Sequence, residues 1–185
     1  MRGGEVYDTV RRLVKRLVDE GLEYSVIGGL ALVEHGYRRA TEDIDLLMRR
    51  ETLDAFRERL VGRGYVPAFP GANKTFRDTE TNVRIEIVTT GDYPGDGKPK
   101  SVAFPDPVNV SVEGDDFRFV TLETLIELKL ASGLSAPHRA RDIVDVQDLI
   151  LRAKLPLELA DRLDTSVQAE YRRLWEIAQS VPPDE

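Results

Sequence analysis

The sequence contains no cysteine, which excludes disulfide scaffolds, thiolate zinc sites and cysteine nucleophiles. Its two histidines form no cluster that could bind zinc. No uninterrupted apolar run approaches the roughly 18 to 20 residues that a membrane span needs. The N-terminal segment has the pattern of a polar helix rather than of a secretion signal. We therefore expect a cytoplasmic protein with no membrane partner.

Positive charge is also in the minority. The chain carries 26 Lys and Arg against 33 Asp and Glu, which gives a net charge of −7. This balance argues against broad electrostatic adhesion to nucleic acid, although a local cluster such as Arg11, Arg12, Lys15 and Arg16 could still contact phosphate. With 41 % apolar residues over 185 positions, the chain is long enough to bury a real core.

The spacing of apolar residues predicts an α/β half followed by a helical half. We expect an α/β core with a small mixed β-sheet and flanking helices over residues 1–120, and a helical C-terminal region packed on that core over 121–185. The patterns predict helices at 5–20, 30–35, 51–61, 122–131, 139–152 and 165–179, and strands at 24–27, 43–47, 74–77, 82–88, 108–112 and 117–120.

Glycine and proline are concentrated in residues 89–108, a stretch that can sustain neither a helix nor a central strand. A loop of this length inside a compact domain is usually functional or mobile. It contains Lys98 and Lys100, so we interpret it as a segment that contacts a substrate or closes over a bound nucleotide.

The segment from Tyr24 to Met48 contains most of the candidate site residues. A short strand meets Gly28-Gly29, and a second strand then begins with Asp43-Ile-Asp45. Side chains alternate along a strand, so both carboxylates share one face. Two carboxylates so close repel each other unless a cation lies between them, and such oxygen ligands suit Mg²⁺. Glu86 offers a third acid on a neighbouring strand, while the glycine pair lets backbone amides approach a polyphosphate.

In this order, Gly28-Gly29, Asp43, Asp45 and Glu86 resemble the signature of the DNA polymerase β-like nucleotidyltransferase superfamily. The stretch 28–45, together with Leu128-Lys-Leu130 and the acids Asp142 and Asp145, is similar to the AbiEii-like branch known from abortive-infection toxins. The resemblance covers roughly residues 20–150. It implies transfer of a nucleoside monophosphate from an NTP to an acceptor, with release of pyrophosphate.

The resemblance also implies a role for each matching residue. Asp43 and Asp45 would ligate Mg²⁺, with two ions present during catalysis, and Glu86 would complete the metal site and deprotonate the acceptor hydroxyl. Gly28 and Gly29 would cradle the phosphates. The remaining candidates for nucleotide binding are Arg39, Thr41, Lys129 and Asp142, of which Lys129 would also stabilise charge on the triphosphate.

Several alternatives stay open. Lys129 could extend from the rim of an amphipathic helix, and Asp142 and Asp145 could be ordinary surface acids. The acceptor could be RNA, a protein hydroxyl or a small molecule, and the chain could be the toxin of a pair with an antitoxin partner. Another class of function is a catalytically silent nucleotide-binding or toxin–antitoxin partner protein on the same fold. The intact acids favour the active enzyme.

Overall fold

The computed structural model describes residues 2–182, with side chains from residue 4 onward, and these residues divide into two compact units. The first unit comprises the residues up to 34, 39–90 and 105–120; the second comprises 35–38, 91–104 and the residues from 121 onward. A mixed seven-stranded sheet, flanking helices and a C-terminal helical region are all present. The predicted α/β class is therefore confirmed.

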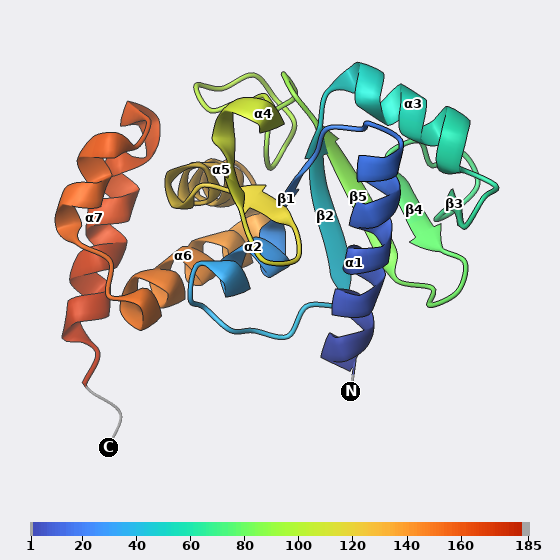
Figure 1. The fold of residues 1–185 in the computed structure, drawn as a ribbon. Helices are drawn as coiled ribbons and strands as arrows, with labels where there is room; N and C mark the ends of the chain where they lie inside the picture. Colours follow the sequence, from blue (N-terminus) through green and yellow to red (C-terminus); the bar gives the residue numbers. More distant parts are fainter. Residues whose placement is uncertain (1, 183–185) are drawn as a thin grey trace. The chain divides into compact units, whose positions relative to one another are not determined.

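The sheet belongs to the first unit and runs in the order β3-β4-β5-β2-β1-β7-β6 (Figure 1). Strand β2 pairs in parallel with β5 and antiparallel with β1, which pairs in parallel with β7; the remaining pairs are antiparallel. The strands are β1 (Ser25–Ile27), β2 (Asp43–Met48), β3 (Tyr65–Pro67), β4 (Thr75–Asp78), β5 (Arg84–Thr89), β6 (Ser111–Glu113) and β7 (Arg118–Val120).

Burial alternates along the central strands, as expected where one face of a sheet meets the core. Ile44 and Leu46 of β2 and Ile85 of β5 are fully buried, whereas Asp43 and Asp45 are only partly covered. Helix α1 contacts β2 and helix α3 contacts β5 (Figure 1). The acidic side chains therefore project from the opposite face of the same strands.

The helices of the first unit agree largely with the sequence pattern. They are α1 (Arg2–Asp19), α2 (Gly28–Glu34), α3 (Arg50–Leu60) and α4 (Pro107–Val110). The prediction of a strand at 108–112 was wrong for its first half. The side chain of Asp106 accepts a hydrogen bond from Val108 N at 3.0 Å and Pro107 follows it, so this segment begins as a helical turn. The short strand β3 was not predicted.

The second unit consists mainly of helices from the C-terminal part of the chain. They are α5 (Leu122–Ser135), η1 (Pro137–Arg139), α6 (Ala140–Ala153), η2 (Leu157–Arg162) and α7 (Thr165–Ser180). Helix α6 contacts both α5 and α7. Helix α7 buries Tyr171, Leu174 and Ala178 on one side. Among residues 2–182, no helix combines the length and apolar character needed to cross a bilayer.

The loop of residues 91–104 is held by hydrogen bonds of the second unit rather than left open. Gly91 N donates to Phe104 O at 2.9 Å, and Asp96 N donates to the hydroxyl of Ser135 on α5 at 3.2 Å. The Lys100 amine donates to the carboxylate of Asp96 and to two carbonyl oxygens of the same loop. Lys100 is thus engaged in holding the loop together.

Candidate functional site

The first group of candidate residues lies on the partly exposed face of the central strands. Asp43 and Asp45 stand two residues apart on β2. In the parallel pairing with β5, Glu86 is the direct partner of Asp45. On the other side of β2, Ile27 at the end of β1 is the partner of Asp45, and Gly28 follows it. The sheet therefore brings the two aspartates, the glutamate and the first glycine into adjacent positions.

The backbone of Gly28 lies directly against the carboxylate of Asp45. Its φ of +66° lies in the left-handed region, which L side chains rarely adopt. A Cβ at this position would overlap Asp45 Oδ2 and lie 2.9 Å from Asp45 Cγ. Glycine is thus required at residue 28 for two reasons, the backbone conformation and the space that the carboxylate occupies.

This contact gives a prediction for Gly28→Ala. The left-handed conformation alone should cost about 1–3 kcal/mol of stability. Displacing the Asp45 carboxylate should in addition reduce the nucleotidyl transfer that the family resemblance implies by about 10²-fold, because misplacing a group at a reaction site by about 1 Å has effects of that size. Urea unfolding and an NTP transfer assay measure the two effects separately.

Gly62→Ala is the matched control for Gly28→Ala. Gly62 has a φ of +81°, but a Cβ added to it would meet no other atom within 4 Å, so this variant carries the backbone strain without the contact. Gly28→Ala should lose at least as much stability as Gly62→Ala, and only Gly28→Ala should lose transfer. Equal transfer rates in the two variants would show that the contact with Asp45 has no role in the reaction.

The second glycine adjoins two further predicted residues. A Cβ on Gly29 would lie 2.7 Å from the Thr41 hydroxyl oxygen and 3.8 Å from Nε of Arg39. The Thr41 hydroxyl also donates to the carbonyl of Asp43 at 3.2 Å, which ties the segment before β2 to the first residue of that strand. Gly29, Arg39 and Thr41 therefore lie together, close to the first residue of β2, and their role in binding nucleotide stays a prediction.

Glu86 is turned toward a neighbour on its own strand. Its Oε2 accepts a hydrogen bond from Nη2 of Arg84 at 3.3 Å, and both side chains are a little under half exposed. Within residues 2–182, no three Asp, Glu or His side chains are gathered as metal ligands. Asp43, Asp45 and Glu86 still suit Mg²⁺, because carboxylate oxygens are the ligands that this ion prefers. The register of the paired strands places all three carboxylates on one face.

The remaining predicted residues belong to the second unit, where they form a buried ionic cluster. Lys129 Nζ on α5 donates to Asp142 Oδ1 at 3.0 Å and to Asp145 Oδ2 at 2.8 Å, both on α6. Ser132 and Arg139, which the sequence analysis did not single out, donate to Asp142 Oδ2 at 2.7 and 2.9 Å. The cluster joins α5 to α6 through charged hydrogen bonds, so Asp142 and Asp145 are not surface acids.

The cluster predicts that the stability of the protein depends on pH in the acidic range. Burial, the largest influence on Asp142, opposes its ionisation, but Lys129, Ser132 and Arg139 outweigh burial and lower the pKa of its carboxyl. A carboxyl with a lowered pKa in the folded state stabilises the protein fully above its unfolded value of 3.8 and loses that effect as the pH falls through the folded value.

We therefore expect the stability lost in Asp142→Asn to depend on pH. Urea unfolding of wild type and variant should show a large difference in unfolding free energy at pH 6 and a smaller one at pH 3, which lies below the unfolded value of 3.8, so that the unfolded wild-type chain already binds the proton. A difference of the same size at both pH values would contradict the lowered pKa.

Comparisons with known proteins give a likeness of fold only. No family model and no curated protein matches the sequence. The chain is similar to a crystal structure of a "putative nucleotidyltransferase" from H. pylori, with 16 % identity, a TM-score of 0.48 and coverage of 93 % of this chain and 92 % of that chain. It is also similar to the crystal structure of JHP933 from Helicobacter pylori, with 16 % identity, a TM-score of 0.47 and coverage of 91 % and 88 %. Function is therefore inferred below from the site residues.

Proposed function

We propose that the chain is a Mg²⁺-dependent nucleotidyltransferase that moves a nucleoside monophosphate from an NTP to a hydroxyl acceptor. One observation carries the proposal. Asp43 and Asp45 occupy the same face of β2, Glu86 is paired with Asp45 across the parallel β5, and the carboxylate of Asp45 rests against Gly28. Carboxylates concentrated on one sheet face, beside a glycine pair that can admit phosphates, suit nucleotide chemistry.

The chain's own residues would bind the NTP, orient it for the reaction and accept the proton of the acceptor hydroxyl. Gly28 and Gly29, which let the backbone pass close to the Asp45 carboxylate and the Thr41 hydroxyl, would present backbone N–H groups to the triphosphate. Arg39 and Thr41, which adjoin Gly29, would contact phosphate oxygens. Lys129 and Asp142 were predicted to bind nucleotide as well; their mutual hydrogen bond favours a structural role in the helical unit.

The reaction joins the acceptor oxygen to the α-phosphorus of the NTP and breaks the bond between the α- and β-phosphates. The electron pair of that bond leaves with pyrophosphate, and the hydroxyl proton passes to Glu86. Asp43, Asp45 and Glu86 would hold the Mg²⁺ ions. When bound, such ions neutralise the triphosphate and orient the attacking and leaving oxygens.

The test is label transfer from each of four α-phosphate-labelled NTPs into total cellular RNA, protein and small molecules. We expect one fraction to become labelled with Mg²⁺, and the label to disappear with EDTA or in the Asp43→Ala, Asp45→Ala double variant. NTP binding without label in any fraction would instead favour the catalytically silent nucleotide-binding protein. Failure to bind any NTP would exclude both. The toxin role and the antitoxin partner remain predictions from the resemblance to the AbiEii-like branch.

A further inference from the structure

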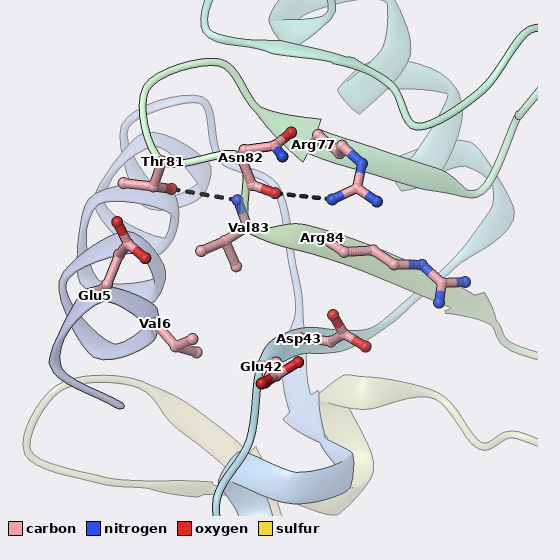
Figure 2. A pocket seen from close by; sticks show the side chains of 9 residues that line it. All are labelled: Glu5, Val6, Glu42, Asp43, Arg77, Thr81, Asn82, Val83 and Arg84. Atoms are coloured by element: carbon pink, nitrogen blue, oxygen red, sulfur yellow. Dashed lines mark hydrogen bonds between the residues drawn. The ribbon is translucent and has the colours of Figure 1, made fainter. Parts of the chain in front are cut away.

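A pocket of about 520 Å³ opens beside Asp43 in the first unit (Figure 2). Its walls come from the first turns of α1, from the residues that enter β2, and from the hairpin between β4 and β5. This volume is within the range of about 300–1,000 Å³ that is usual for small-ligand sites. Because Asp43 lines the pocket and also belongs to the proposed metal site, a ligand held there would lie next to the reacting groups.

Several hydrogen bonds hold the wall of the pocket that the β4–β5 hairpin forms. Asp78 at the end of β4 is buried, and its Oδ1 accepts hydrogen bonds from the backbone N of Glu80 and Thr81. Its Oδ2 accepts a hydrogen bond from Arg12 of α1 at 2.9 Å. The hydroxyls of Thr9 and Thr81 are also hydrogen-bonded, at 3.0 Å. The pocket is therefore formed before any ligand binds.

Two arginines stand side by side along the pocket. Arg77 on β4 is the direct partner of Arg84 on β5, and Arg84 is in turn the partner of Asp43 on β2. Like charges placed directly opposite in an antiparallel pair destabilise a sheet. Arg77 donates to the carbonyl of Asn82 at 2.9 Å, and Arg84 is 3.3 Å from Glu86. An anion between the two guanidinium groups would relieve their repulsion.

The position of the arginines in the sheet separates them from the proposed triphosphate site. The glycine pair follows β1, on one side of β2, whereas Arg84 and Arg77 lie on β5 and β4, on the other side. Neighbouring strands are about 4.8 Å apart, so these backbone positions are about 10–14 Å from the glycine side. The arginines are therefore placed on the side of β2 opposite the glycine pair, which favours a group other than the triphosphate as their ligand. Three acids also line the pocket, Glu5 on the side away from the arginines in Figure 2 and Glu42 and Asp43 where the chain enters β2. Their charge would repel an anion, so a phosphate would be held only where the two guanidinium groups face it.

We propose that this pocket holds the acceptor, and that Arg77 and Arg84 bind a phosphate group that the acceptor carries near its reacting hydroxyl. The inference rests on the proposed function. Guanidinium groups suit phosphate because their planar N–H donors match its oxygens in pairs. The phosphate can belong to a polynucleotide or to a phosphorylated small molecule. Arg84 would release the Glu86 carboxylate and bind this phosphate when the Glu86 side chain turns toward the metal ions.

The first test is the chemical nature of the labelled acceptor. Label from the NTP should enter RNA or phosphorylated small molecules, and either result supports the proposal while naming the source of the phosphate. If label enters only proteins, or only acceptors that carry no phosphate before the reaction, this inference is overturned while the proposed nucleotidyl transfer stands. No label in any fraction would overturn both, so the two failures are distinguishable.

The second test removes the arginines. Arg77→Gln/Arg84→Gln should raise the KM for the acceptor by about 10-fold or more without changing the KM for the NTP, because charged hydrogen bonds to phosphate are lost. Arg57→Gln/Arg59→Gln, a surface pair on α3, is the matched control and should leave both values unchanged. An unchanged acceptor KM in the Arg77→Gln/Arg84→Gln variant would overturn the assignment of the pocket.

The third test needs no catalysis. Inorganic phosphate, titrated in metal-free buffer, should shift the Nε–H resonances of Arg77 and Arg84 in NMR spectra of the full chain. Glu86→Gln should tighten this binding about two- to fivefold, since it removes the exposed ion pair that competes for Arg84. The double arginine variant should weaken phosphate binding at least about 10-fold. Equal phosphate affinity in wild type and double variant would contradict the proposal even if the enzyme is active.

Discussion

Asp45→Asn is expected to reduce the proposed nucleotidyl transfer by about 10²–10³-fold, because losing a single preorganised electrostatic group has effects of this size. The amide has nearly the shape of the carboxylate, so the contact with Gly28 is kept and the fold should be unaffected. It lacks the negative charge, however, and is a poorer ligand for a hard cation. The rate of label incorporation with saturating NTP and Mg²⁺ measures the effect.

Asp54→Asn provides the control for the charge change itself. Asp54 lies on α3, its side chain is 66 % exposed, and it pairs with Arg57 on the surface. This variant should transfer at the wild-type rate, because exposed ion pairs contribute little. The metal-site proposal fails if Asp45→Asn retains more than about a tenth of wild-type activity, given the expected 10²–10³-fold range.

Lys129→Met is expected to give the largest loss of stability, about 3–5 kcal/mol, because it leaves buried carboxylates without their cation. Lys129 is 8 % exposed, Asp142 7 % and Asp145 2 %, so water cannot compensate for the missing amine. Arg139 still reaches Asp142, which keeps the effect within this range. Chemical unfolding of the variant, followed by circular dichroism, measures the loss.

Lys15→Met is the matched lysine control. Lys15 pairs with Asp19 on α1, and its side chain is 76 % exposed. Its replacement should change stability by less than about 1 kcal/mol. Similar losses in the two lysine variants would mean that the buried cluster contributes no more than an exposed helix pair.

A double variant separates the structural role of Lys129 from a role in chemistry. Lys129→Met/Asp145→Asn removes both charges of one buried pair, and it should recover part of the stability lost in Lys129→Met. If transfer returns together with stability, Lys129 acts by joining α5 to α6. If the double variant is stable but inactive, the amine is needed by the substrate, as the resemblance to the AbiEii-like branch implies.

Much of the fold could be predicted from local pattern. The apolar positions of α1 recur at helical spacing, and the alternating residues of β2 and β5 mark one buried face, so both signals lie within a short stretch of sequence. The segment at 108–110 shows the limit of such reasoning. Its valines favour a strand, but the Asp106 cap and Pro107 stabilise a helical turn at this position.

Local sequence pattern predicted the candidate site residues: the glycine pair, the two aspartates that share a face of β2, and a glutamate on a later strand. Only the tertiary structure decided their partners, because strand order and register depend on contacts between distant segments. It paired Glu86 with Asp45, placed Arg77 beside Arg84, and joined Lys129 to Asp142 and Asp145 across two helices. Periodicity fixes the face on which a residue lies, whereas long-range packing fixes the group that it meets there.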